Sequence, residues 1–411
     1  MNPFQLTGAV DHPLVMPDTP AVTRIRTAFT QPASTLLVYG ARRMGKRAIL
    51  EQAVREVVAV RGHAFVADLS TVSTLADGAN RLLAAASQAL GRSWPDVAGE
   101  FATRLGRMLT IHPEPGTGVL VPRLAVAFRR ADVAQQREAL GRVLDAVDAM
   151  AAARGVTIGI ALNEFQELAR FGGEDAEWHL RDVIRHHRHV SYVLAGSTPS
   201  LTRRLLDRSR TFYQLLEPLH VGPVDPTLLA RWIEEQMATA GVAATGAGAR
   251  IVAVAGPRTR DVVRLARTCF DRGAAAGVVR PDDVAGAFTE LVAGREDLAR
   301  AFWEGCTPHQ QNVLRAVAVH ATGLTTAAVL ERFGLRSTSA TAHALGGLVA
   351  GEHLVREPLA REHLVGEGPE RPETPRYTYD SPYLRGWVLV HALPDIGLTL
   401  PITRLPGGLV A

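Results

Sequence analysis

The chain has 411 residues, of which 47% are apolar and 21% are charged, so it has an ordinary globular composition and enough length for two or three domains. Two cysteines, Cys269 and Cys306, exclude a disulfide framework and favour reduced thiols. The sequence contains neither a signal-peptide pattern at its start nor an apolar run of about 18 residues, the length typical of a membrane span. We therefore expect a cytoplasmic protein without membrane contact. The net charge is +4, and the high pI of about 9.4 is weak evidence for nucleic acid, because much of it reflects heavy arginine usage.

In the first half of the chain, short apolar segments alternate with helical patterns. Strands are predicted over 36–39, 64–68, 158–162 and 190–195, with helices over 48–60, 74–110 and 137–153 and a small hairpin over 112–126. Strands that alternate with helices indicate an α/β fold with a parallel, doubly wound sheet. Its functional site is expected where the strands end.

The second half is predicted to be helical over 224–299 and then to change character. Three short helices over 307–319, 325–332 and 337–350 precede two β segments, near 353–357 and 376–380. Three helices and a hairpin are typical of a winged helix-turn-helix. We therefore predict three domains, over 1–223, 224–300 and 301–411.

Lys46 is the only lysine among 45 basic residues, and it lies in a glycine-rich segment that follows the first strand. This segment fits G-x-x-x-x-G-K, the phosphate-binding loop, except at the position after the lysine. Arginine cannot easily replace a compact ammonium that reaches a phosphate over a tight loop. We predict binding of ATP or ADP by Gly40, Arg42, Arg43, Met44, Gly45, Lys46, Arg47 and Ala48. The alternative is a vestigial turn that only supports the core.

Several landmarks carry a family resemblance over nearly the whole chain. They are Asn-Pro-Phe at 2–4, the phosphate loop, Asn-Glu-Phe-Gln-Glu-Leu at 163–168, Ser-Tyr-Val-Leu-Ala-Gly-Ser at 191–197 and Asp-Arg-Ser-Arg-Thr-Phe-Tyr at 207–213. Together they resemble the archaeal-type P-loop ATPases of the AAA+/STAND group. The resemblance implies a P-loop AAA+-like nucleotide-binding core over 1–223, a helical lid over 224–300 and a C-terminal winged-helix domain over 301–411.

The chain departs from this family pattern at two positions that hold Mg²⁺. Arg47 replaces the hydroxyl residue after the lysine, and Asn163 replaces the aspartate that ends the Walker B strand. Both changes oppose a hard cation that prefers anionic or strongly polar oxygens. Glu164, which polarises the attacking water in the family, is retained, and Ser197 lies at the sensor position. We therefore expect nucleotide binding for which Mg²⁺ is weak or dispensable, with very slow or absent hydrolysis.

Two further candidates each have a simpler reading. Arg208 and Arg210 lie near the position of an arginine finger in the family, although a solvated helix face is favoured for them in an arginine-rich chain. Pro257 and Arg258 resemble the lid motif that packs against adenine, although a turn between two helices is the plain alternative.

The histidines at 186, 187 and 189 lack a partner with metal-ligand spacing, so a solvated helix end is favoured over a metal site. The segment 301–411 holds nine arginines against ten acidic residues, a poor electrostatic footprint for DNA. Its predicted recognition helix begins with small polar residues that could read a major groove. DNA binding and a packing or partner-binding role therefore both stay open for the winged helix.

The leading hypothesis is a regulatory or scaffold protein of the AAA+/STAND type, whose bound ATP or ADP controls conformation or self-association. The alternatives are an active ATPase that acts on DNA or protein, and a nucleotide-gated regulator that binds DNA through the winged helix. Metal-dependent phosphate release separates the first two hypotheses. Salt-sensitive duplex binding identifies the third.

Overall fold

The computed structural model describes residues 2–4, 19–106, 109–113, 120–124, 133–197, 212, 215–357 and 375–403. Its contacts divide the chain into two compact units. Val10–Gly222 forms one unit, and Met1–Ala9 together with Pro223–Ala411 forms the other. Among the described residues, no helix is both long and apolar enough to cross a membrane.

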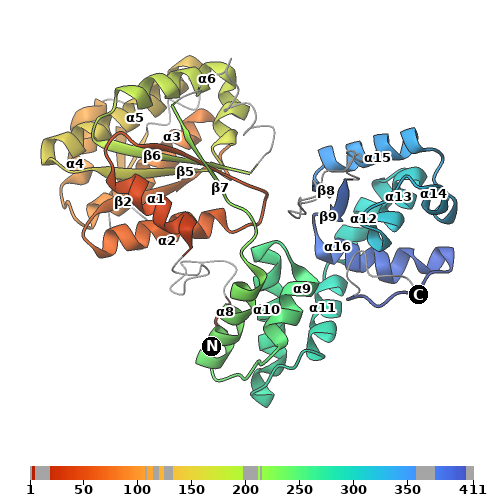
Figure 1. The fold of residues 1–411 in the computed structure, drawn as a ribbon. Coiled ribbons are helices and arrows are strands. Elements are labelled where there is room, and N and C mark those ends of the chain that lie inside the picture. The colour runs from red at the N-terminus through yellow and green to blue at the C-terminus, as the bar shows by residue number, and fades with distance from the viewer. Residues whose placement is uncertain are drawn as a thin grey trace, which may run out of the picture. The chain divides into compact units, whose positions relative to one another are not determined.

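The Val10–Gly222 unit is built on a five-stranded parallel sheet (Figure 1). Its order is β2 (His63–Asp68), β5 (Ile158–Asn163), β6 (Val190–Gly196), β1 (Thr35–Tyr39) and β7 (Glu217–His220). The neighbouring interior strands β5 and β6 are buried along their whole length, as expected for apolar runs that are covered on both faces. The α/β fold class with a parallel sheet is therefore confirmed.

Helices cover both faces of this sheet and bury two apolar clusters against it. One face carries α3 (Leu75–Gly91), α4 (Val97–Leu105), α5 (Val133–Arg154) and α6 (Gln166–His186), and the other carries α1 (Pro20–Thr30) and α2 (Lys46–Ala59). An antiparallel pair, β3 (Leu109–Pro113) and β4 (Leu120–Leu124), forms the expected hairpin. The sheet is thus fixed from both sides, and only its strand ends are left to build a site.

The single helix expected over 74–110 is wrong, because the structure breaks it into α3 and α4. Thr74 caps the start of α3 by accepting a hydrogen bond from the Asp77 backbone N–H. The break follows Gly91, where Trp94 turns in to pack on the core ahead of Pro95, a residue that cannot continue a helix. The sequence analysis also missed α1 and the edge strand β7.

The second unit is mostly helical. It comprises α8 (Pro226–Thr239), α9 (Ala247–Ala255), α10 (Thr259–Gly273), α11 (Asp283–Ala293), α12 (Glu296–Gly305), α13 (Pro308–Val319), α14 (Ala327–Arg332), α15 (Thr338–Ala350) and α16 (Pro382–Trp387), with the antiparallel pair β8 (Leu354–Glu357) and β9 (Arg376–Tyr379). A capping box formed by Thr307 and Gln310 sets the start of α13.

Helix α16, which the sequence analysis missed, joins the C-terminal elements to the helices before them. The Tyr383 hydroxyl donates to the Asp261 backbone carbonyl at 2.8 Å, and the Tyr383 ring stacks on Phe288 with centroids 5.5 Å apart. Gly386 allows this approach, because a Cβ atom there would lie 2.8 Å from the Phe288 ring. The helices of 224–300 and the C-terminal elements therefore share one packed interior.

The start of the chain packs on the same unit. Phe4 is fully buried and meets Trp232 and Phe270 edge to face, with centroids 5.9 Å and 6.4 Å away. The Asn2 side chain donates to the Arg267 carbonyl at 3.1 Å. The Asn-Pro-Phe segment is thus an anchor on α8 and α10.

Candidate functional site

The loop after β1 has the backbone conformation of an anion-binding concavity. Arg43 and Gly45 adopt left-handed conformations, with φ of 65° and 87°. Alternation of right- and left-handed residues turns successive N–H groups toward one side, and the N-terminus of α2 adds its own N–H groups. The Met44 side chain is buried in the core beneath the loop and holds it in place.

Lys46 opens α2, and its side chain is 5% exposed. Its ammonium donates to the carbonyl oxygens of Gly40 at 3.0 Å and Ala41 at 2.8 Å. Gly40 lies against the chain after β7, where a Cβ atom would meet the Val221 carbonyl oxygen at 2.1 Å. The lysine therefore curls over the loop, with its charge beside the N–H groups that would bind a phosphate.

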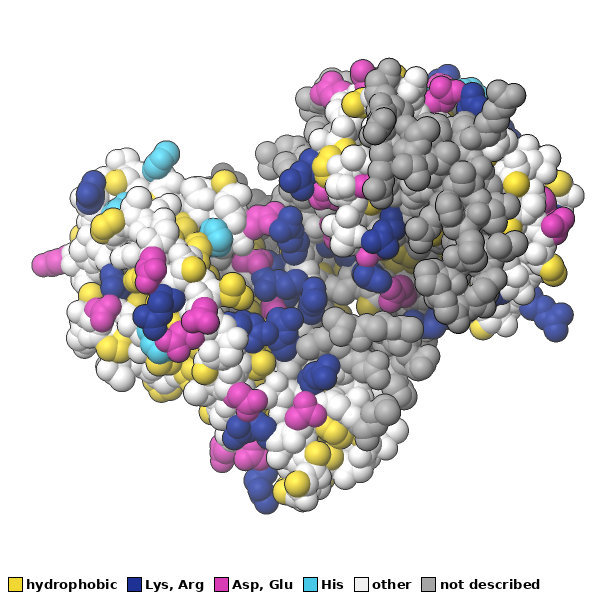
Figure 2. Space-filling model, turned by 180° about the vertical axis from the view of Figure 1, so that it is seen from behind, with side chains coloured by type: hydrophobic (Ala, Val, Ile, Leu, Met, Phe, Trp, Pro, Cys, Tyr) yellow, Lys and Arg dark blue, Asp and Glu magenta, His cyan; other side chains and the backbone are white. Residues whose placement is uncertain are grey.

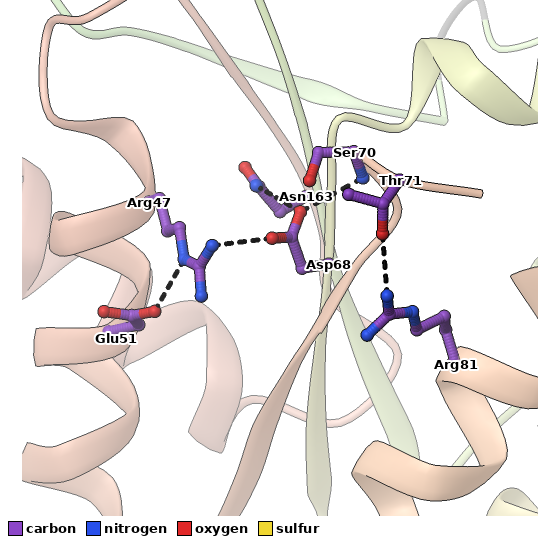
Figure 3. Close-up of polar contacts among 7 residues, drawn as sticks. All are labelled: Arg47, Glu51, Asp68, Ser70, Thr71, Arg81 and Asn163. Atoms are coloured by element: carbon purple, nitrogen blue, oxygen red, sulfur yellow. Dashed lines mark hydrogen bonds and ion pairs between the residues drawn. The ribbon is translucent and has the colours of Figure 1, made fainter. Parts of the chain in front are cut away.

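A second charged cluster lies next to the loop, where β2 and β5 end (Figure 3). Arg47 donates through a terminal nitrogen to Asp68 Oδ2 at 2.7 Å and through Nε to Glu51 Oε1 at 2.8 Å. Burial alone would lower the pKa of Arg47, but the hydrogen bond to Glu51 and the charges of Glu51 and Asp68 together raise it. The guanidinium therefore stays charged and bridges two carboxylates.

Asn163 faces the same aspartate from the neighbouring strand. Asp68 and Asn163 are direct register partners at the ends of β2 and β5, and the Asn163 amide donates to Asp68 Oδ1 at 3.0 Å. The Ser70 backbone N–H donates to the same oxygen at 3.2 Å. Sequence reasoning missed Asp68, although it ends a predicted strand just as Asn163 does.

Glu164 follows β5 with a left-handed backbone, φ 55°. One carboxylate oxygen, Oε2, accepts a hydrogen bond from Ser197 Oγ at 3.0 Å and another from the Gln166 amide. These bonds occupy an oxygen that a general base would use toward water. The structure therefore brings five predicted site residues together where the parallel strands end. They are Lys46, Arg47, Asn163, Glu164 and Ser197.

The other predicted site residues are Pro257, Arg258, Arg208 and Arg210. Pro257 and Arg258 belong to the other compact unit, where Arg258 is 5% exposed and forms an ion pair with Asp380. This contact gives Arg258 a structural partner within its own unit. Arg208 and Arg210 lie outside the described residues.

The expectation that the histidines after α6 are solvated is wrong for His187, which is buried. Its Nδ1 lies 2.6 Å from the Tyr192 hydroxyl and its Nε2 lies 2.9 Å from Asp145 Oδ1. Burial, followed by the charges of Asp148 and Asp145, raises the pKa of Tyr192 well above its ordinary value. Among the described residues, no three His, Cys, Asp or Glu side chains gather as a metal site.

Comparison with known proteins finds structures of similar fold but no similar sequence. No family model matches the sequence, and no curated protein is similar to it. Among solved structures, the Walker-type ATPase PABY2304 of Pyrococcus abyssi superposes with a TM-score of 0.54 at 14% identity, over 89% of this chain and 93% of that one. The ORC1 protein of Aeropyrum pernix in complex with DNA gives a TM-score of 0.47 at 16% identity, over 94% and 96% of the two chains.

Proposed function

We propose that this chain, which has the fold of an AAA+ P-loop ATPase, is a nucleotide-binding regulatory or scaffold protein. Bound ATP or ADP controls its conformation or assembly, and hydrolysis is weak or absent. One observation carries the proposal. The only lysine of an arginine-rich chain lies buried in a loop whose backbone has the form of an anion-binding concavity.

Binding is expected to depend little on Mg²⁺. Asn163 lacks a carboxylate and Arg47 lacks a hydroxyl, so the side chains that hold the metal in P-loop ATPases are missing. Lys46 and Arg47 supply positive charge to the phosphates instead. Weak hydrolysis follows, because the metal no longer bridges the β- and γ-phosphate oxygens and Glu164 is engaged by Ser197.

The test is nucleotide affinity, measured with a fluorescent ADP analogue and by calorimetry, for the unmodified protein and Lys46→Ala. The variant loses charge-assisted hydrogen bonds, each of which is worth about 1.5–3 kcal/mol, so affinity should fall by about 10- to 150-fold. Arg55→Ala, an exposed change in the same helix, is the matched control. Equal affinity of Lys46→Ala and the unmodified protein would favour the vestigial-turn interpretation.

Retention of Glu164 favours the second candidate function, an active ATPase that acts on DNA or protein. A steady-state turnover near 1 s⁻¹ or above, which is about the lower end of common enzyme rates, would support it if Glu164→Gln abolished the activity. Turnover at background in both proteins would support the regulatory proposal.

Self-association and a macromolecular partner complete the proposal. Arg208 and Arg210 are the candidates for reaching the nucleotide site of a neighbouring copy. The segment after residue 300, proposed as a winged helix, is the candidate for binding DNA or protein. On the face that Figure 2 presents, acidic and basic side chains both occur on the described surface. The segment 301–411 carries nine arginines against ten acidic residues, so a protein partner is preferred to DNA, and weak salt dependence of any duplex binding would agree with this choice.

A further inference from the structure

The Mg²⁺ that a P-loop ATPase fold implies does not fit the residues of this chain. In such folds the metal is held by a hydroxyl after the lysine and by an aspartate in the Walker B strand. Here the side chain after the lysine is a guanidinium that bonds to Asp68 at 2.7 Å and to Glu51 at 2.8 Å. The Arg47 guanidinium is therefore already the cation that pairs with the carboxylates of Asp68 and Glu51.

Asp68 is the residue that connects the members of this arrangement. Each of its oxygens has a donor: Oδ2 accepts from Arg47, whereas Oδ1 accepts from the Asn163 amide and the Ser70 backbone N–H. Figure 3 shows the carboxylate joined by dashed lines to the Arg47 guanidinium, the Asn163 amide and Ser70. The carboxylate missing from β5 is thus present one strand away, at the same level of the sheet.

The neutral amide of Asn163 can lie beside the negative Asp68 carboxylate without repulsion. A carboxylate in its place would face Asp68 Oδ1 across about the same 3.0 Å, and two anions that close repel each other strongly unless a cation lies between them. The three residue types therefore form a consistent set: an arginine that supplies the cation, an aspartate that holds it and an amide that tolerates the aspartate.

We propose that Arg47 and Asp68 form a built-in replacement for the divalent cation, with Asp68 as the positioning residue that holds the guanidinium beside the phosphate loop. This inference rests on the proposed nucleotide binding and deepens it, because it names the source of the missing positive charge. It also implies a latent metal site. Once the guanidinium is removed, the carboxylates of Asp68 and Glu51 both lose their cation, and together with a hydroxyl at position 47 they can supply oxygen ligands to a hard cation.

The test uses Arg47→Ser, which removes the guanidinium and restores a hydroxyl after the lysine. The Arg47 side chain is 60% exposed, so the variant is expected to fold, and its melting temperature checks this. Arg47→Ser/Asp68→Asn removes the latent ligand as well, and Asp68→Asn alone shows the effect of that change with Arg47 in place. Arg55→Ser in the same helix is the matched control.

The first measurement is Mn²⁺ binding without nucleotide, followed by electron paramagnetic resonance. Arg47→Ser should bind Mn²⁺, whereas the unmodified protein, the double variant, Asp68→Asn and Arg55→Ser should not. Mn²⁺ binding by the unmodified protein, or equal binding by Arg47→Ser and the double variant, would overturn the inference.

The second measurement is ADP affinity in Mg²⁺ and in EDTA. For the unmodified protein and Arg55→Ser the two values should agree within about twofold, whereas Arg47→Ser should bind about tenfold more weakly in EDTA and recover in Mg²⁺. Indifference of Arg47→Ser to Mg²⁺ would contradict the inference. If the unmodified protein binds no nucleotide at all, the proposed function fails, and the Mn²⁺ measurement still decides whether Arg47 occupies a cation site.

Discussion

Replacing Asn163 with aspartate should destabilise the protein in a pH-dependent way. The Asn163 amide lies 3.0 Å from Asp68 Oδ1, so the new carboxylate would face an existing one at about that distance. Two unit charges 3.0 Å apart repel by about 5 kcal/mol at an effective dielectric constant of about 20, which corresponds to about 4 pKa units. Arg47 attracts both carboxylates and offsets roughly half of this, so we expect a net cost of about 2–3 kcal/mol at pH 8.

The direction of the pH effect follows from the protonation state of the two carboxyls that the folded protein prefers. The paired carboxyls have a raised pKa in the folded protein, so the folded state binds more protons than the unfolded chain above about pH 4. Stability relative to the unmodified protein is therefore kept at low pH and lost as the pH rises. Thermal melting in EDTA should show Asn163→Asp lower by about 5 °C or more at pH 8 and by much less at pH 5.

Asn163→Ala is the control, because it removes the hydrogen bond without adding a charge. Its melting temperature should fall by a similar amount at both pH values. If Asn163→Asp shows the same deficit at pH 5 as at pH 8, the two carboxylates do not interact, and our account of the cluster is wrong.

Two further predictions concern the stability of each compact unit. Phe4→Ala should cost about 2–4 kcal/mol in chemical denaturation, because it empties a buried aromatic pocket, whereas Leu298→Ala at a 75% exposed position should cost little; equal midpoints would refute the anchor. The hydrogen bond from Arg154, opposed by burial and aided by the charges of Arg154 and Arg104, lowers the pKa of Glu100. The stabilisation from the ionised Glu100 carboxylate is therefore present at neutral pH and lost as the pH falls below about 4.5. Glu100→Gln should be less stable than the unmodified protein by about 0.5–1 kcal/mol at pH 7 but equally stable at pH 3. A deficit that persists at pH 3 would rule out this charge effect.

The central sheet could be predicted from the sequence because its strands are buried on both faces and read as continuous apolar runs. Strands β5 and β6 are the clearest examples. The edge strand β7 could not be predicted in this way, since it is mostly exposed and contains Pro218, a residue that argues against a strand. Helix α16 was missed because it starts at Pro382 and is only six residues long, too short for a helical period to show.

For the candidate site, the sequence motifs predicted the residues that belong to them. They did not predict the residues that only strand pairing places next to the motifs. Lys46 and Glu164 were predicted from their neighbours in the sequence. Asp68 lies 95 residues from Asn163, and only the pairing of β2 with β5 places the two side chains together. The burial of His187 was likewise not predictable from its position at a helix end, because its partners Asp145 and Tyr192 come from α5 and β6.

The solitary lysine also gives the protein an unusual chemistry toward amine reagents. Lys46 carries the sole side-chain amine of the chain, and that amine is 5% exposed and bonded to two carbonyl oxygens. Acylation, biotinylation or carbamylation of side-chain amines therefore has one target, which lies inside the phosphate loop. Any reagent that reaches it reports on the opening of that loop, and any enzyme that acetylates lysine could modify this chain there alone.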